Sequence, residues 1–320
     1  MILIAGGEGD PNTTRLVRRS AVRDVPHLAL LAGAGSCPSI VWDITRDRLE
    51  LDGSVIRPRA VFLRYDVFGH LRDGRAESQK RAARWYDTML SWVFAHKGVA
   101  FLNRLYGTRH VTKPLLLHLA KSVGIDIPET IVTNDRERLE ASQADRWIAK
   151  PVNGGEYTRV LSDAWHDEAW LRQFSAEPTI VQQRLDAPDL RIYRVGDRWF
   201  AFSLHSQAVD YRIDNNVCIR NVAPTAELIV PLARLMDYLG LDFGAADYKR
   251  CPESGKYLFL EVNSAPMFIA FDRLVDGALA DRILDWLLAR TGSPKAAQDA
   301  LPRATLKSDS TQACRSPASS

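Results

Sequence analysis

Two carboxylates and one carboxamide are brought together by the last strands that the sequence predicts. Glu261 and Asn263 are two residues apart in an apolar segment, so both side chains leave the same face of a strand. A second apolar segment carries Asp247, and a stretch with the composition of a tight turn, centred on Ser254, separates the two segments. Such a hairpin places Asp247 opposite Glu261. Three oxygen-bearing side chains on one surface predict a Mg²⁺ site.

Two lysines in separate segments have the surroundings of phosphate-binding groups. Lys150 ends a short apolar strand and precedes a loop with Gly154 and Gly155, whose backbone can approach an anion closely. Lys113 begins a predicted helix that has a proline in its first turn. The chain has only nine lysines against 33 arginines, so lysines at both places are less readily explained as surface residues. Together with the predicted metal site, they indicate a nucleotide-binding enzyme.

These segments resemble an ATP-grasp ligase of the RimK-like branch, and within it the ligases that cyclise microviridin-type (graspetide) peptides. Each match is short, but together they run in the family's order over roughly residues 100–290. The matching segments are Lys113 with its helix, Ile148–Pro151, Ile180–Leu185, Asp189–Asp197, Ala201–Gln207, Asp210–Arg212 and Glu261–Pro266. The resemblance to the peptide-cyclising branch rests mainly on two of these segments, Ala201–Gln207 and Asp210–Arg212.

The resemblance implies a role for each candidate residue. Lys113 and Lys150 would contact the ATP phosphates under a lid that contains Gly154 and Gly155, while Asp247, Glu261 and Asn263 hold the metal. The backbone of Gln182, Gln183, Arg184 and Leu185 would contact the adenine edge, and Asp189 the ribose. Arg191, Arg212 and, less directly, Arg220 would face the transferred phosphoryl group, where guanidinium groups stabilise developing charge. His205 is expected to be structural or to line the substrate site, because this mechanism needs no histidine base.

The implied reaction has two steps. Mg²⁺, for which we expect two ions and consider Mn²⁺ an alternative, offsets the phosphate charge. A substrate carboxylate attacks the γ-phosphorus of ATP to give an acyl phosphate and ADP, and an amine or hydroxyl then displaces phosphate. In the peptide-cyclising branch both reacting groups lie on one precursor peptide, and the product is a lactone or a lactam.

Two other functions fit the same residues. A RimK-type or glutathione-synthetase-like ligase would join a free amino acid to a peptide or small molecule at the same ATP site. A non-catalytic ATP-binding regulator could share the fold, although an intact metal triad with both lysines argues against it. A nucleic-acid-binding module fits poorly because the arginines are dispersed and no stripe of basic and aromatic residues is present.

The composition is that of a soluble enzyme. Hydrophobic residues make up 46% and charged residues 25% of the 320, and a net charge of +3 is too small to indicate nucleic acid as a partner. No apolar run approaches the ~18 residues of a membrane helix. The four cysteines are widely spaced, which argues against a disulfide framework or a zinc site and fits the cytoplasm. A homodimer is compatible with the sequence.

The predicted fold class is α/β (α+β), an ATP-grasp fold with an N-terminal α/β domain. We expect this domain over residues 1–108, a central ATP-grasp subdomain over 109–185, a C-terminal subdomain over 186–291, and a disordered tail over 292–320. Periodicity predicts helices over 76–96, 135–142, 225–239 and 272–290, among others, and a strand over 157–161. Gly196 and Asp197 separate two further predicted strands and suit a two-residue hairpin turn. Four arginines (Arg15, Arg18, Arg19 and Arg23) are expected on a solvated helix face rather than at a site for an acidic peptide.

Overall fold

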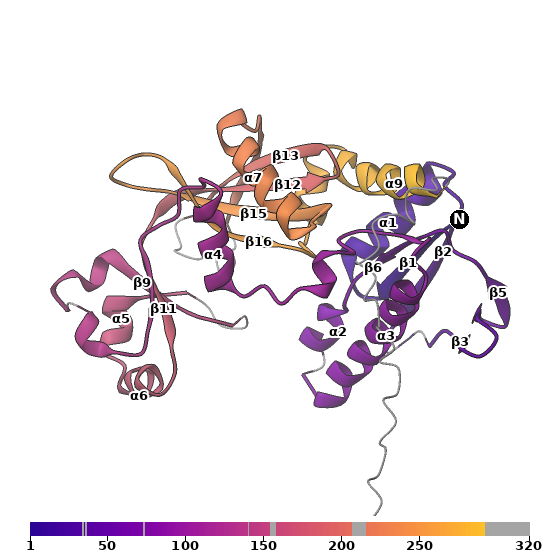
Figure 1. The fold of residues 1–320 in the computed structure, drawn as a ribbon, viewed down its shortest axis with the longest axis horizontal. Coiled ribbons are helices and arrows are strands. Elements are labelled where there is room, and N and C mark those ends of the chain that lie inside the picture. The colour runs from indigo at the N-terminus through magenta and orange to yellow at the C-terminus, as the bar shows by residue number, and fades with distance from the viewer. Residues whose placement is uncertain are drawn as a thin grey trace, which may run out of the picture.

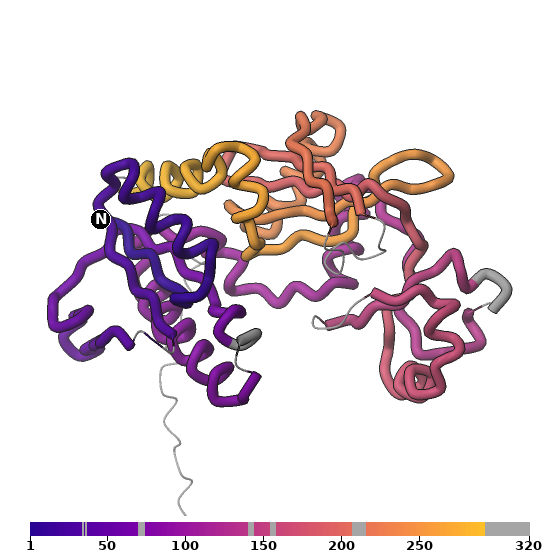
Figure 2. Tube along the Cα trace, turned by 180° about the vertical axis from the view of Figure 1, so that it is seen from behind, coloured from indigo at the N-terminus to yellow at the C-terminus, as the bar shows by residue number. Residues whose placement is uncertain are grey.

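The computed structural model describes residues 1–33, 35, 37–72, 74–139, 141–153, 158–206 and 216–291. Among the predicted site residues, Gly154, Gly155 and Arg212 lie outside this part of the chain, as does the tail 292–320. The N-terminal domain and a smaller central domain lie at the two ends of the molecule, with a C-terminal sheet between them (Figure 1). Figure 2 shows the same arrangement from behind.

The N-terminal domain is built on a parallel sheet with the strand order β2-β1-β6-β7. One face of the sheet packs against the long helix α3. The other packs against α1 and α9 (Ala278–Arg290), the last helix that the structure describes. A small antiparallel sheet, β3-β4-β5, lies beside this core. The elements are β1 (Ile2–Gly7), α1 (Pro11–Val22), β2 (His27–Ala32), β3 (Ile40–Asp43), β4 (Arg48–Leu51), β5 (Ser54–Ile56), β6 (Ala60–Leu63), α2 (Val67–Arg72), α3 (Ala76–Ala95) and β7 (Ala100–Phe101).

The central domain has an antiparallel sheet with the order β10-β9-β11-β8 and two short helices. Its strands are β8 (Thr130–Thr133), β9 (Trp147–Pro151), β10 (Arg159–Val160) and β11 (Thr179–Gln183), and its helices are α5 (Leu161–Trp165) and α6 (Glu168–Ala176). Helix α4 (Lys113–Ser122), which precedes them, packs against the C-terminal sheet instead. The chain thus places α4 next to the strands that carry the predicted metal site.

Two predictions for the central domain are wrong in detail. The expected helix 135–142 is replaced by 3₁₀ turns at Arg136–Arg138 and Ala141–Arg146. The Asp135 side chain accepts a hydrogen bond from the N–H of Glu137 and so caps the start of the first turn. The expected strand 157–161 is described only as the two-residue β10, because Leu161 is buried and begins α5.

The C-terminal sheet is antiparallel, in the order β14-β13-β12-β15-β16. One face packs against α4 and α7, and the other against α8, α9 and the N-terminal domain. Gly196, which starts the predicted two-residue hairpin between β12 and β13, has a φ of +63°. The elements are β12 (Asp186–Val195), β13 (Arg198–His205), β14 (Cys218–Val222), α7 (Ala226–Leu239), β15 (Phe243–Arg250), β16 (Tyr257–Asn263), α8 (Ile269–Arg273) and α9 (Ala278–Arg290).

The predicted helix 272–290 is wrong at its start, because the chain makes two helices there. α8 ends at Arg273, and Gly277 has a φ of +89°, a conformation that breaks an α-helix and that glycine adopts without strain. Asp272 is fully buried, and its Oδ1 accepts a hydrogen bond of 2.9 Å from the N–H of Ala280 in α9. The carboxylate therefore joins the two helices.

The arginines of α1 are not a solvated face, which corrects the expectation from the sequence. Arg15 Nε donates to Asp272 Oδ2 at 2.7 Å. Arg19 forms an ion pair with Asp281, and Arg23 with Asp285, both of α9. Figure 1 shows α1 and α9 side by side. Only Arg18 of the four arginines is exposed. The other three connect the first helix of the chain to α8 and α9, near the end of the described residues.

None of the helices in the described part of the chain combines the length and the apolar character needed to cross a lipid bilayer.

Arg15→Met should lower the free energy of unfolding by about 1.5–3 kcal/mol, because it removes the charged partner of the buried Asp272 carboxylate. Urea unfolding followed by circular dichroism measures the change. Arg18→Met, on the exposed side of the same helix, should stay within about 0.5 kcal/mol of the unmodified protein. Equal effects of the two substitutions would show that the Arg15–Asp272 pair does not stabilise the fold.

Candidate functional site

A cavity of about 610 Å³ lies between the central sheet and the C-terminal sheet. It is lined by residues of α4, β9, β11, β12, β14, β15, β16 and α8, so both the central domain and the C-terminal sheet contribute. Most of the described residues that the sequence marked as candidates line this cavity: Lys113, Lys150, Gln182, Gln183, Leu185, Asp189, Arg191, Asp247, Glu261 and Asn263. Segments far apart in the sequence are thus brought to one place.

The hairpin β15–β16 places the metal triad as predicted, with one irregularity. Asp247 pairs with Glu261, and Asn263 is two residues further along β16. A β-bulge beyond Asp247 shifts the register by one residue, so Tyr248 pairs with Phe259. Leu260 is the extra residue, and both Leu260 and Glu261 line the cavity, although successive side chains of a regular strand face opposite sides.

The three side chains of the triad meet one another. Asn263 Nδ2 lies 3.1 Å from Asp247 Oδ2 and 3.1 Å from Glu261 Oε1. The amide thus takes the position between two carboxylates where a cation would be attracted, and rotation of the amide presents its oxygen there instead. Among the described residues no group of three or more His, Cys, Asp or Glu side chains forms a metal site. Two carboxylates with an amide oxygen fit a hard divalent cation such as Mg²⁺.

Arg191 is held against the metal triad. Its Nη1 lies 2.8 and 3.0 Å from the two carboxylate oxygens of Asp247, and its Nε donates to Tyr193 Oη at 2.9 Å. The guanidinium also lies over the ring of Phe271, 5.5 Å from its centre. Burial raises the pKa of Asp247 to about 6, an effect that Arg191 opposes and the neighbouring Glu261 carboxylate adds to. The cavity therefore concentrates charge in a poorly solvated place.

Lys113 and Lys150 reach the cavity from opposite sides. Lys113 Nζ lies 4.0 Å from Glu261 Oε2, and Lys150 Nζ donates to Gln182 Oε1 at 2.8 Å. Gln182 is fully buried, and its amide nitrogen donates to Thr130 Oγ1, which fixes the oxygen toward the lysine. The pKa of Lys150 is lowered to about 8, mainly by burial. The Glu261 carboxylate opposes this shift, and the Lys113 charge adds to it. Gln182 therefore orients Lys150 through its side chain, a role that the sequence did not suggest.

The segment predicted to contact adenine joins β11 to β12. Leu185 is buried and lines the cavity, whereas Arg184 is not part of the described lining. The N–H groups of Gln183 and Arg184 donate to the carbonyls of Glu129 and Arg146 within the central domain. A base contact through either N–H would require a change of partner, so the N–H of Leu185 is the better candidate donor.

Lys249 is a cavity residue that the sequence analysis missed. It is only 6% exposed, and its Nζ lies 3.3 Å from Asp189 Oδ2, the carboxylate predicted to bind ribose. The register of β12 against β15 places the two residues directly opposite each other. A signal was present, because Lys249 is two residues from Asp247 and so shares its face of the strand. Three of the nine lysines of the chain thus line one cavity.

Arg220 does not join the other candidates. It is exposed on β14, and the described cavity lining includes its neighbour Ile219 instead. Because successive side chains of a strand face opposite sides, Arg220 points away from the cavity. His205 is exposed at the end of β13, with Nε2 3.0 Å from Ser203 Oγ. The structure gives no support to a catalytic role for Arg220.

Comparison with solved structures identifies the fold. The ATP-grasp ligase PsnB, complexed with a minimal precursor, matches with a TM-score of 0.72 and 24% sequence identity over 91% of this chain and 98% of that chain. This chain has the ATP-grasp fold. The predicted fold class is therefore confirmed, although the sequence matches no protein-family model and no curated protein.

Two further structures show the same similarity. A RiPP-associated ATP-grasp ligase of Chryseobacterium gregarium, in complex with ADP and a leader and core peptide, has a TM-score of 0.68 at 20% identity, with 94% of this chain and 99% of that chain covered. The macrocyclase MdnC of Microcystis aeruginosa MRC, bound with precursor peptide MdnA, has a TM-score of 0.63 at 18% identity over 90% and 99%. The likeness spans nearly the full length of each chain.

Lys113→Gln should raise the pKa of Lys150, because it removes a nearby positive charge that disfavours a second one. Titration of isotopically dimethylated lysines, followed by NMR with Lys150→Arg used to assign the signal, measures the pKa. Lys121→Gln, near the other end of α4, should leave it unchanged. If Lys113→Gln had no effect or lowered the pKa, the two ammonium groups would not share the cavity.

Proposed function

We propose that this protein is an ATP-dependent ligase that activates a carboxylate as an acyl phosphate and joins it to a hydroxyl or amine. The observation that carries the proposal is the convergence, in one cavity of an ATP-grasp fold, of three lysines, one arginine and a triad suited to Mg²⁺. Positive groups and carboxylates that face one cavity can hold a triphosphate together with its metal. No other cavity described in this chain combines these groups.

Asp247, Glu261 and the oxygen of Asn263 would hold Mg²⁺, with Mn²⁺ as an alternative ion. When bound, the ion supplies charge neutralisation at the β- and γ-phosphates. Lys113 and Lys150 would bind phosphate oxygens as point charges. Arg191 would contact the transferred phosphoryl group while its Nη1 holds both carboxylate oxygens of Asp247. Arg212 and the glycine loop remain predictions from the sequence.

The covalent chemistry needs no protein nucleophile. An oxygen of the substrate carboxylate forms a bond to the γ-phosphorus while the bond to the β–γ bridging oxygen breaks and ADP leaves. A hydroxyl or amine then attacks the acyl carbon, phosphate departs, and the proton of the nucleophile is lost to solvent or to phosphate. The protein would contribute by positioning the groups and by stabilising charge.

We further propose that the substrate is a ribosomal precursor peptide and that the product contains lactone or lactam crosslinks. Structures with the same fold were solved with precursor peptides, among them PsnB with PsnA2 and MdnC with MdnA. The cavity of this chain also has an apolar part, formed by Val217, Ile219, Met267 and Phe271, which suits an organic substrate beside the nucleotide. The reaction would take place in the cytoplasm.

Glu261→Gln should reduce ADP release by about 100-fold or more while leaving the fold intact, because an amide cannot replace a carboxylate at the metal. A coupled ADP assay in the presence of the precursor peptide measures turnover, and circular dichroism checks the fold. Glu227→Gln, on an exposed turn of α7, should keep full activity. Unchanged turnover in Glu261→Gln would remove the metal assignment.

The product distinguishes the candidate ligases. Co-expression with a precursor peptide encoded beside the gene should give a product lighter by one water per ring. A mass gain that corresponds to an added amino acid would instead identify a RimK-type ligase. Absence of ADP formation with either kind of substrate, despite nucleotide binding, would identify a non-catalytic regulator.

A further inference from the structure

The segment that follows the metal triad has no regular secondary structure of its own. β16 ends at Asn263 and α8 begins at Ile269, and the residues between them form neither helix nor strand. Pro266 and Phe268 are buried here, so backbone groups of the segment need partners outside it. Ala265, Pro266 and Met267 also line the cavity, so the position of this segment bears directly on the candidate active site.

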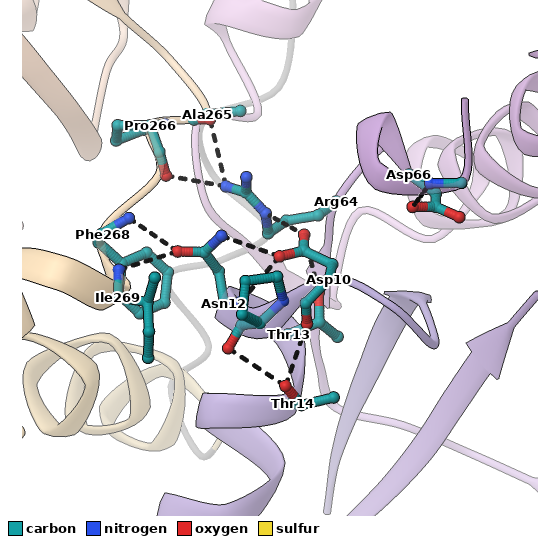
Figure 3. A network of polar contacts seen from close by, with 12 residues as sticks. Asp10, Asn12, Thr13, Thr14, Arg64, Asp66, Ala265, Pro266, Phe268 and Ile269 are labelled. Atoms are coloured by element: carbon teal, nitrogen blue, oxygen red, sulfur yellow. Dashed lines mark hydrogen bonds and ion pairs between the residues drawn. The ribbon is translucent and has the colours of Figure 1, made fainter. Parts of the chain in front are cut away.

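Side chains from other elements bind this segment at six successive residues, as Figure 3 shows for most of them. Asn103 Nδ2 donates to the carbonyl of Ser264 at 2.8 Å, and Tyr193 Oη donates to that of Met267 at 2.6 Å. Between them, Arg64 Nη1 donates to the carbonyls of Ala265 and Pro266, at 3.2 and 2.9 Å.

The last two groups of the segment are amides, and one side chain binds both. Asn12 Oδ1 accepts hydrogen bonds from the N–H groups of Phe268 at 2.7 Å and Ile269 at 3.0 Å. Asn12 and Arg64 both belong to the N-terminal domain. The backbone of the segment is therefore held by a domain that contributes nothing to the described lining of the large cavity.

Arg64 is the centre of this network. It follows β6 directly, is 6% exposed, and its Nε donates to Asp10 Oδ2 at 2.8 Å. Asp10 is fully buried, and its other oxygen accepts from the backbone and the side chain of Asn12 at 2.8 Å each. One ion pair thus fixes both Arg64 and Asn12, which bind four of the six backbone groups of the segment (Figure 3).

The other end of the segment leads back to the metal triad. Tyr193 binds the carbonyl of Met267 and accepts from Nε of Arg191, which in turn binds Asp247. At the near end, Asn263 directly precedes the segment and bridges Asp247 and Glu261. Both series of hydrogen bonds therefore connect the segment to the carboxylate of Asp247.

We propose that Arg64 is a positioning residue for the metal site: by binding the carbonyls of Ala265 and Pro266, it sets where Asn263 lies between the two carboxylates. This inference rests on the proposed function, since it assigns Arg64 a role in Mg²⁺ binding. A planar guanidinium can bind two carbonyls and a carboxylate at once, whereas an ammonium on a flexible stem does not reproduce that geometry. The effect should therefore depend on the shape of the group and not only on its charge.

The test compares Arg64→Lys with Arg104→Lys. Arg104 is a matched control, because its guanidinium also binds backbone carbonyls, those of Val93 and Val99, at 2.9 and 2.6 Å. Those carbonyls belong to the N-terminal domain, away from the metal triad. Calorimetry measures the affinity for ADP with and without Mg²⁺, and thermal unfolding measures stability in the same samples. The ratio of the two affinities is the readout, since a purely structural role would not change it.

We expect the unmodified protein and Arg104→Lys to bind ADP more tightly with Mg²⁺ than without it, by the same factor. Arg64→Lys should reduce that factor by about tenfold or more while affinity for ADP without metal stays near that of the unmodified protein. An unchanged factor in Arg64→Lys would overturn the proposal. If the unmodified protein showed no benefit from Mg²⁺, the proposed function itself would fail, which is a different result.

A second variant covers the case in which Arg64→Lys does not fold. Asn103 has a φ of +60°, which glycine adopts without strain, so Asn103→Gly removes the bond to Ser264, together with two bonds to the backbone of Phe243, without forcing its own backbone to change. Asn103→Gly should also reduce the factor by which Mg²⁺ tightens the binding of ADP. If Asn103→Gly were folded and retained the full factor, the claim that the 264–269 segment positions the metal site would be rejected.

Discussion

Two like charges that face each other across a pair of strands set the main constraint on this structure. Asp247 and Glu261 occupy paired positions, where like charges destabilise a sheet, and burial deprives Asp247 of water. The raised pKa of Asp247, to about 6, expresses that cost. Such an arrangement persists only if positive groups converge on it, and the chain supplies Arg191 at 2.8 Å and Lys113 at 4.0 Å. The cavity is therefore built around an electrostatic need that a divalent cation would meet best.

All three parts of the chain contribute to the charge balance or the position of these carboxylates. The hairpin β15–β16 provides the carboxylates, α4 and the central sheet provide Lys113 and Lys150, and the N-terminal domain fixes the backbone that leaves the triad through Arg64. The docking of α1 on α8 and α9 belongs to the same arrangement, because α8 begins where the 264–269 segment ends. Stability of the domain interface and geometry of the site are thus linked by one short stretch of chain.

The sequence predicted the parts of this site that depend on local pattern. Alternation along β16 and the turn before it were enough to place Asp247 opposite Glu261. The bulge at Leu260 was not predictable from alternation; in the folded chain Leu260 packs against a cluster that contains Leu185. Asn103 and Arg64 carry no local signal at all. Their partners in the 264–269 segment are 161 and 201 residues away, and only the folded chain brings them together.

The fold was predicted with similar limits. Helices with a clear apolar face, such as α3 and α7, were placed within a residue or two of their bounds. The helix 272–290 was drawn through Gly277 because its apolar periodicity continues across the break, yet the φ of +89° there shows that the turn overrides the pattern. Arg15, Arg18, Arg19 and Arg23 were expected on a solvated helix face, yet only Arg18 is exposed and the other three form a paired face. That the face meets acidic residues some 260 positions later is tertiary information.

The chain divides its cationic residues by the chemistry each can perform. Arginines bind pairs of oxygens at fixed positions, as Arg64 and Arg104 do with backbone carbonyls and Arg19 does with Asp281. The guanidinium stays charged under all ordinary conditions, which suits contacts that must not depend on pH. Lysine is scarce, and three of the nine lie in the cavity, where burial brings the pKa of Lys150 to about 8. A lysine near its pKa gains its full charge when an anion arrives, so phosphate binding and protonation favour each other there. The scarcity of lysine elsewhere is what made these positions stand out in the sequence.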